Sequence, residues 1–475
     1  MKILFILYQP ILHERMGVMH LISSLKKLNY DVKLAFSKGN LEKLVSDYRP
    51  SIIAFSAMTG EYLALLKVNN FLKRRFKFIS VFGGAHATFF PDIISEKDID
   101  AICVGEADIA LAEFCERVKN KGRYWETENF IVKYENKIFR NPLRPLVEDL
   151  DKLPFADREL MYKADRDLLS EGGKTFFSSR GCPHRCTYCF NKRYNQIYAG
   201  RGKIVRFRSP ENFIEEIYNV KQNFPMDAVS IEDDVFILKP TDWFIQFGKL
   251  YKRKISLPFN CNLRANLVTE EVIALLKEAG LDSVCMAIEC SDEKIANDIL
   301  KRGLTNSQIL DVVKILKKYN IKLTTQNMVG MPVRDAYGID KKTLDFNIGI
   351  NPIFALTSIL YPYPGTEIAD YAQKSGFMDK APILETNKYS TVFKYSKEER
   401  RKIENLHKIF GIIVSFPFLR KFCDFLCGLP LKKFYNCLFY FWYGYIFKTK
   451  IVPFRSFKKE IGKYFRLWIK MLFLR

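Results

Sequence analysis

Three cysteines near the middle of the chain have the spacing that most clearly indicates chemistry. Cys182, Cys186 and Cys189 form a CxxxCxxC pattern within the run RGCPHRCTYCFN. Three thiolates this close can hold three irons of a four-iron cluster, which leaves the fourth iron open to a substrate or cofactor. Zinc is the alternative, with His184 or a distant cysteine as its fourth ligand. The unequal spacing and the aromatic residue before Cys189 favour the cluster.

The elements around these cysteines predict a barrel. Six apolar segments, each read as a strand and separated by helical patterns, cover residues 175–179, 228–231, 257–264, 283–289, 322–329 and 355–360. Six such units form an open, partial (β/α)6 barrel, with its functional residues at the carboxyl ends of the strands. The polar residues at these ends are Glu232, Asp233, Asp234, Arg264, Glu289 and Gln326. Buried charges need partners, which a zwitterionic cofactor would supply; solvated loop charges are the alternative.

A second array of strands and helices precedes the barrel. Residues 2–7, 31–36, 51–55, 76–82 and 101–104 are the predicted strands, and helical patterns lie between them. This order predicts a doubly wound parallel sheet, which binds its ligand at the carboxyl ends of the strands. Small residues there would let a flat or phosphorylated ligand approach the backbone, unless they only form tight turns. The absence of GxGxxG after the first strand disfavours a nicotinamide dinucleotide. The candidate residues are Ser56, Thr59, Gly83, Gly84, Gly105 and Glu106.

Together these features resemble the cobalamin-binding-domain radical S-adenosylmethionine (SAM) enzymes. The resemblance rests on CxxxCxYC after a strand, the preceding sheet, the DLDKLPF connector and the later YPYPGTEI run, and it covers residues 1–385. It implies a [4Fe-4S] cluster on the three cysteines that cleaves SAM reductively to methionine and a 5′-deoxyadenosyl radical. It also implies cobalamin at the six N-terminal strand-end residues.

The resemblance further implies roles for five residues of the barrel. Asp233 and its neighbours would meet the SAM amino group, Arg264 its carboxylate and Glu289 its ribose. Tyr188 would contact the adenine through its backbone, and Gly330 would leave room for it.

Three motifs depart from the family pattern. GMPVRD replaces GLPGET, and AIECS replaces GIESG. The DxHxxG motif is absent because His13 and Gly17 have the wrong spacing and position 11 is isoleucine, so cobalt would receive no histidine from this loop.

The C-terminal segment is strongly basic and aromatic. Residues 391–475 hold 19 Lys and Arg against 5 Asp and Glu, which is 14 of the chain's net charge of +22, together with 22 aromatic residues. Its apolar runs are too short to cross a bilayer and are typical of segments that lie in a membrane interface. A helical cap on the barrel is the main alternative, and a nucleic-acid patch is disfavoured.

These observations predict four parts and one activity. The parts are a cobalamin-binding-like domain at 1–125, a linker at 126–170, a radical SAM barrel at 171–385 and a helical tail at 386–475. The expected activity is cobalamin-dependent methyl transfer to an unactivated carbon of a lipid-like substrate, with flavodoxin or ferredoxin as electron donor. The alternatives are radical cyclisation or C–C bond formation without methyl transfer, and a non-catalytic membrane-associated iron–sulfur protein.

The expected location is the cytoplasm, with peripheral contact to the inner face of the membrane. Eleven cysteines without a recognisable export signal indicate a reducing compartment.

Overall fold

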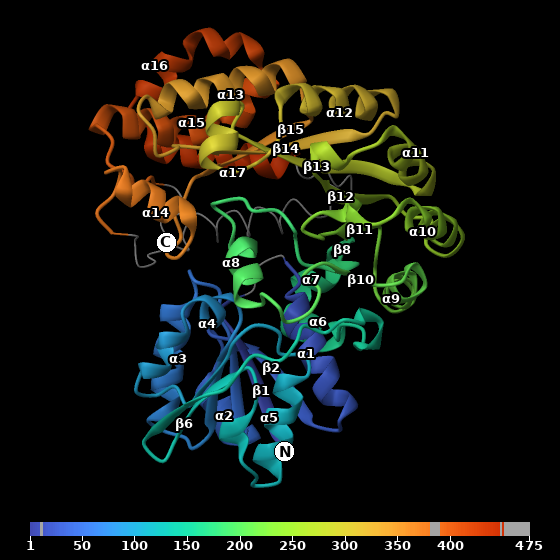
Figure 1. The fold of residues 1–475 in the computed structure, drawn as a ribbon, viewed down its shortest axis with the longest axis vertical. Coiled ribbons are helices and arrows are strands. Elements are labelled where there is room, and N and C mark those ends of the chain that lie inside the picture. Colours follow the sequence, from blue (N-terminus) through green and yellow to red (C-terminus); the bar gives the residue numbers. More distant parts are fainter. Residues whose placement is uncertain (10–12, 381–389, 447–448, 451–475) are drawn as a thin grey trace.

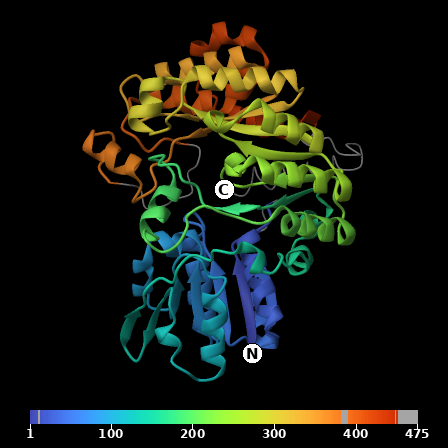
Figure 2. The same ribbon diagram turned by 45° about the vertical axis from the view of Figure 1, so that its right-hand side comes forward.

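The computed structural model describes residues 1–9, 13–380, 390–446 and 449–450. The described residues form two large sheets and one two-stranded sheet, with the N-terminal sheet (blue) below the six-stranded second sheet (green to yellow) in Figure 1. The described C-terminal helices, in orange and red, lie on the second sheet (Figure 2). The mixed α/β architecture predicted from the sequence is confirmed.

The N-terminal sheet has the strand order β2-β1-β3-β4-β5-β6-β7, and its first five strands are parallel. Alternate residues of β1 face opposite cores, because successive side chains of a strand point to opposite faces: Ile3 and Phe5 to one, Leu4 and Ile6 to the other. The strands are β1 (Lys2–Leu7), β2 (Asp31–Phe36), β3 (Ile52–Ser56), β4 (Ile79–Gly83), β5 (Ala101–Cys103), β6 (Phe130–Tyr134) and β7 (Lys137–Arg140).

Helices cover both faces of this sheet, as the doubly wound prediction requires. One face packs against α1 (Met16–Lys27) and α5 (Ala110–Lys119), and the other against α2 (Leu41–Tyr48), α3 (Tyr62–Lys73) and α4 (Ala85–Phe89). The β6–β7 hairpin is antiparallel and lies in the segment expected as a linker. The same segment also contains α6 (Arg158–Ala164) and α7 (Arg166–Ser170).

A buried charge network joins this segment to the second sheet. Arg158 pairs with Glu14, which follows β1, and it donates to the Thr175 carbonyl oxygen at 2.6 Å. Tyr162 also donates to the Glu14 carboxylate. These groups are almost fully buried, so the network fixes the start of the barrel against the N-terminal sheet.

The second sheet consists of six parallel strands in the order β15-β14-β13-β12-β11-β8, which confirms the predicted partial barrel. A β9–β10 pair and α8 accompany its first strand. The six strands are β8 (Gly173–Phe176), β11 (Ala228–Ile231), β12 (Phe259–Leu263), β13 (Leu281–Glu289), β14 (Lys322–Val329) and β15 (Phe354–Ile359), and the separate antiparallel pair is β9 (Ser179–Arg180) and β10 (Arg206–Phe207). The helices are α8 (Phe190–Ile197), α9 (Pro210–Asn223), α10 (Thr241–Lys254), α11 (Glu270–Ala279), α12 (Asn306–Lys318), α13 (Ala336–Ile350) and α14 (Glu367–Lys374).

The first helix of the tail is part of the barrel's core. Helix α15 (Lys397–Ser415) packs against β15 and α13, and its residues Ile403, Leu406 and Phe410 are fully buried. For α15 the capping interpretation is therefore confirmed. Two further helices follow it, α16 (Cys423–Gly428) and α17 (Lys432–Ile446). The basic run after residue 450, at 451–475, lies outside the described residues.

His86 gives the N-terminal domain a predicted sensitivity to acid. Its ring stacks on Tyr62, with 4.1 Å between centroids, and burial lowers its pKa to about 4. In the unfolded chain the pKa returns to about 6.5, so the unfolded state binds more protons between these values. The neutral His86 ring therefore contributes its full stabilisation of the folded domain above pH 6.5, and this contribution is lost as the pH falls towards 4. We expect His86→Phe, which has no group to protonate, to reduce the acid-induced loss in the free energy of unfolding by about 1 to 3 kcal/mol. Urea unfolding at neutral and mildly acidic pH measures the effect, and identical pH dependence in both proteins would contradict it.

Candidate active site between the two sheets

The helix that follows the three cysteines packs on the carboxyl edge of the N-terminal sheet. Phe190, the first residue of α8, stacks on Phe89 of α4 with 4.4 Å between ring centroids. The Arg193 guanidinium lies over the rings of Phe89 and Phe90. Figure 1 shows α8 between the two sheets and directly above α4. The cysteine loop and the ligand-binding edge of the N-terminal sheet therefore border the same region.

Ion pairs fix this arrangement at both ends of the cysteine loop. Arg180, two residues before Cys182, makes a bidentate pair with Asp108 at 2.8 and 3.0 Å. Arg206, after the loop, makes a second bidentate pair with Glu106 at 2.8 and 3.0 Å. Both arginines belong to the β9–β10 pair, and both carboxylates follow β5 of the N-terminal sheet.

The same contacts give Glu106 and Gly105 a different role from the cobalamin binding that the sequence suggested. The Glu106 carboxylate is occupied by Arg206, Arg180 and the Val147 backbone N–H. Gly105 has a φ of +79°, and a Cβ there would lie 1.8 Å from the Tyr198 hydroxyl oxygen of the barrel. These residues therefore join the two domains. Their position at a strand end suggested a ligand, because the sequence does not show that the barrel closes over that end.

The other four predicted cobalamin residues remain at the open part of the edge. The sheet order reverses between β1 and β3, and such a switch point is where open parallel sheets bind ligands. Ser56 ends β3 and Thr59 lies in the loop after it, while Gly83 ends the neighbouring strand β4 and Gly84 follows it. Met58 lies in the same loop with 52% of its surface exposed, although most large apolar side chains of this domain are buried.

Gly84 adopts a backbone conformation that other residues avoid. Its φ of +88° and ψ of −169° lie in a region that only glycine populates freely, and a Cβ would lie 3.0 Å from the Ala57 carbonyl oxygen. We expect Gly84→Ala to strain this loop by about 1 to 3 kcal/mol and to lower cobalamin affinity by about tenfold. Gly39→Ala, after β2, is the control because its Cβ would meet no atom closer than 3.4 Å. Cobalt per chain after reconstitution is the measurement, and equal loading of both variants would contradict the prediction.

The cysteine loop is built around Gly181. Gly181 has a φ of +90°, and a Cβ there would lie 2.1 Å from the Ile204 carbonyl oxygen, so this tight approach needs glycine. Cys182 and Cys186 are buried and Cys189 is half-buried. Within the described part of the chain, no three His, Cys, Asp or Glu side chains converge on a point as ligands of one ion would. A four-iron cluster would place each thiolate on a different iron.

Two buried arginines lie beside this loop. Arg264 Nη1 lies 3.9 Å from the Cys186 Sγ, and Arg264 also donates to the Arg302 carbonyl oxygen. Burial, followed by the neighbouring Arg302 charge, lowers the pKa of Arg264. Two adjacent guanidinium groups that have few protein anions beside them stabilise negative charge nearby, such as a bound carboxylate or the cysteine thiolates. No sequence signal marks Arg302, because it follows a helical segment and not a strand.

Tyr188 links Arg302 to Glu289. Its hydroxyl accepts from Arg302 Nη1 at 2.9 Å and donates to Glu289 Oε1 at 3.3 Å. Glu289 ends β13 with a φ of +66°, and burial raises the pKa of its carboxyl group. A non-glycine residue held in this conformation is a sign of a functional constraint. Thus the structure brings Tyr188, Glu289 and Arg264 together beside the cysteine loop.

A buried nitrogen near this group has no protein partner. His184 Nε2 is buried and makes no hydrogen bond to the described residues, and burial followed by the charges of Arg264 and Arg302 lowers the pKa of His184 to about 4. Buried polar atoms are rarely left unpaired, so this one fits a site that a ligand completes.

Asp233 has a different place from the one predicted. Its fully buried carboxylate accepts from the Ser178 and Ser179 backbone N–H groups at 2.7 and 3.1 Å and pairs with Lys239 at 2.9 Å. Its neighbour Asp234 lies beside Cys182 and Cys189 instead, and burial raises the pKa of Asp234. The sequence could not distinguish three consecutive acids. The structure shows that Asp233 holds the turn between β8 and β9.

Gly330 also faces protein. Its backbone N–H donates to both Asp340 oxygens at 3.0 and 3.1 Å, and a Cβ would lie 3.1 Å from Ile403 of α15. Helix α15 therefore fills the side of Gly330 where the sequence predicted adenine.

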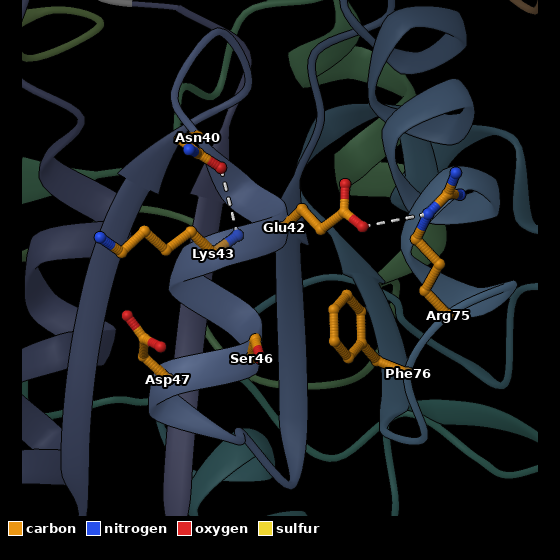
Figure 3. A pocket seen from close by; sticks show the side chains of 7 residues that line it. All are labelled: Asn40, Glu42, Lys43, Ser46, Asp47, Arg75 and Phe76. Atoms are coloured by element: carbon orange, nitrogen blue, oxygen red, sulfur yellow. Dashed lines mark hydrogen bonds and ion pairs between the residues drawn. The ribbon is translucent and has the colours of Figure 1, made fainter.

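A shallow surface depression between α2 and the end of α3 lies apart from this region. Figure 3 shows its seven lining residues, including the Glu42–Arg75 ion pair at 3.3 Å. None of the predicted site residues lines it, so we assign it no role in the proposed chemistry.

Comparison with known proteins identifies both domains. Residues 176–336 match the radical SAM superfamily, and residues 6–115 match the B12 binding domain family. An uncharacterized methyltransferase of Pyrococcus horikoshii is 25% identical over 413 residues, covering 83% of this chain and 85% of the relative.

Two solved structures share the fold. The cobalamin-dependent SAM radical enzyme OxsB, with aqua-cobalamin and SAM bound, has a TM-score of 0.69 at 13% identity over 98% of this chain and 75% of its own. The radical SAM methyltransferase TsrM of Kitasatospora setae, with cobalamin and a [4Fe-4S] cluster bound, has a TM-score of 0.64 at 14% identity over 80% and 76%. The chain therefore combines a domain of the radical SAM superfamily with an N-terminal domain of the B12-binding family.

Proposed function

We propose that this enzyme transfers a methyl group to an unactivated carbon of a lipid-like substrate and requires cobalamin. The observation that carries the proposal is the shared border of the cysteine loop and the switch point of the N-terminal sheet, fixed by the Arg180–Asp108 and Arg206–Glu106 pairs. The Pyrococcus relative and TsrM are both described as methyltransferases, which supports methyl transfer as the reaction.

Named residues fit each group that the reaction needs. Cys182, Cys186 and Cys189 would hold the cluster. Ser56, Thr59, Gly83 and Gly84 would border cobalamin. When bound, the reduced cluster supplies the electron that cleaves SAM, and cobalamin supplies the methyl group.

The chain's own charges would orient SAM. Arg264 and Arg302 form a buried positive region beside Cys186 that suits the SAM carboxylate. Glu289, held by Tyr188, offers acceptor oxygens for ribose hydroxyls. Asp234, beside two of the cysteines, would accept from the amino group in place of the fully engaged Asp233.

The substrate class follows from the composition of the tail, in which aromatic and basic residues alternate. Such segments lie at membrane interfaces, where apolar substrates are found. Reducing equivalents would come from flavodoxin or ferredoxin. Radical cyclisation or C–C bond formation without methyl transfer is the competing function.

Anaerobic turnover distinguishes these functions. The protein would be reconstituted with iron, sulfide and hydroxocobalamin, reduced, and incubated with SAM carrying a labelled methyl group and with a lipid extract. We expect 5′-deoxyadenosine and the methyl label in an extracted product. Formation of 5′-deoxyadenosine with no label in any product would favour the competing function.

A further inference from the structure

Large exposed apolar side chains are concentrated in one short stretch of the tail. Among the described residues, 17 large apolar side chains are exposed, and nine of them lie between 416 and 445. The other eight are scattered over residues 28–310. Scattered exposed apolar residues are ordinary, whereas a concentrated group marks an interaction surface.

The exposed side chains do not result from incomplete packing of the tail. In α16, Cys423 and Cys427 are fully buried, while Phe425 is 68% exposed. The Asn405 side chain of α15 donates to the Cys427 and Leu429 carbonyl oxygens at 2.9 and 2.8 Å, which fastens α16 to the barrel cap. The inward side of α16 is therefore packed against the barrel cap, and Phe425 faces outward from this fixed support.

Three of the exposed aromatic residues form one continuous group through Trp442, which is half-buried. The Phe416 ring, at the end of α15, lies 6.3 Å from Phe418 and 5.4 Å from Trp442 of α17. Trp442 in turn lies 5.6 Å from Tyr445. We call Phe416, Phe418, Trp442 and Tyr445, together with the 64% exposed Phe441, the tail surface.

Basic residues accompany the tail surface. Lys421 follows Phe418 and lies over the Phe422 ring at 5.0 Å, and Lys450 comes five residues after Tyr445 in the sequence; both are exposed. Between residues 416 and 446, Asp424 is the single acidic residue, and it pairs with Lys341 at 3.0 Å. Exposed aromatic rings with neighbouring lysines suit an apolar boundary that carries negative charge.

The length of the helices restricts how the tail could meet a bilayer. Among the described residues, no helix combines the length and the apolar character needed to cross a membrane. Contact with a bilayer through this surface would therefore be peripheral, with rings among the headgroups and lysines at the anionic phosphates.

We propose that the tail surface docks the enzyme on an anionic lipid bilayer. Helix α17 also contacts the barrel, because Tyr443 lies 5.7 Å from Phe354 at the start of β15. Docking would thus hold the barrel itself at the membrane. This inference concerns binding alone and does not depend on methyl transfer.

Vesicle flotation of the full chain tests the proposal. Vesicles of phosphatidylcholine alone are compared with vesicles that also contain phosphatidylglycerol, at low and high salt. We expect binding to the anionic vesicles that weakens as salt screens the charges. We expect Phe418→Ser combined with Phe441→Ser to reduce binding by about tenfold or more, because each ring loses its apolar insertion.

Phe71→Ser is the matched control, since Phe71 is 41% exposed on α3, far along the chain from the tail. Flotation of this variant should equal that of the wild-type protein. Absence of the wild-type chain from both kinds of vesicle, or unchanged flotation of the double variant, would overturn the proposal. A dimer in solution that the double variant abolishes, without vesicle binding, would show instead that the surface joins two copies.

Discussion

Replacing Cys182, Cys186 and Cys189 together by alanine is expected to abolish cluster binding and to reduce SAM cleavage by at least about a thousandfold. The three thiolates are the proposed protein ligands of the irons, and the loop that carries them is fixed by Gly181 and by the Arg180–Asp108 pair. Iron content, the optical absorption of the cluster and the release of 5′-deoxyadenosine are the measurements.

Cys285→Ala is the control for this experiment. Cys285 is a half-buried thiol on β13 of the barrel and lies outside the cysteine loop, so its loss should leave the iron content unchanged. A triple variant that still cleaves SAM would show that the cluster is held elsewhere.

Asp233→Asn is expected to destabilise the barrel by about 3 to 5 kcal/mol, because it leaves the buried Lys239 charge without its anion. Lys239 and Asp233 are both fully buried and 2.9 Å apart. Asp234→Asn is the matched variant: it should keep the fold and the cluster and should weaken SAM binding by about tenfold. Urea unfolding and equilibrium dialysis of the reconstituted proteins with SAM measure the two effects.

The opposite pattern would restore the role that the sequence suggested for Asp233. If Asp233→Asn unfolds at the same urea concentration as the wild-type protein and loses only SAM binding, then Asp233 faces the cofactor in solution.

The architecture could be predicted because its signals are local. Buried parallel strands appear as short apolar runs, and the glycines and polar residues after them mark the edge of a sheet. This was enough to locate the strands from β1 to β5 and the six strands of the barrel. The β6–β7 hairpin was missed because its outer strand, β7, is mostly exposed and lacks an apolar run.

The contacts of the site were harder to predict because they depend on how the two sheets and the tail come together. Glu106 and Gly105 have the sequence signature of a ligand-binding edge, but Arg206 and Tyr198, some 90 to 100 residues later, occupy them. Gly330 has the signature of an open strand end, but Ile403 lies beside it. Periodicity and spacing carry no information about such long-range contacts.

Cysteine spacing, in contrast, is a local property that chemistry restricts strongly. The cysteines, Arg264, Glu289 and Tyr188 could be proposed from the sequence because each lies in a motif or at a predicted strand end. Arg302 completes the group through its hydrogen bond to Tyr188, and only the folded structure shows this bond.

The most direct test of the account is the metal content of one anaerobic preparation. Wild-type protein and the triple cysteine variant would be reconstituted with iron, sulfide and hydroxocobalamin, desalted, and analysed for iron and cobalt per chain. We expect the wild-type chain to retain iron for one four-iron cluster together with one cobalt, and the variant to lose the iron while it keeps the cobalt. A wild-type chain that retains iron and cleaves SAM but binds no cobalt would contradict the proposed role of the N-terminal sheet and, with it, cobalamin-dependent methyl transfer.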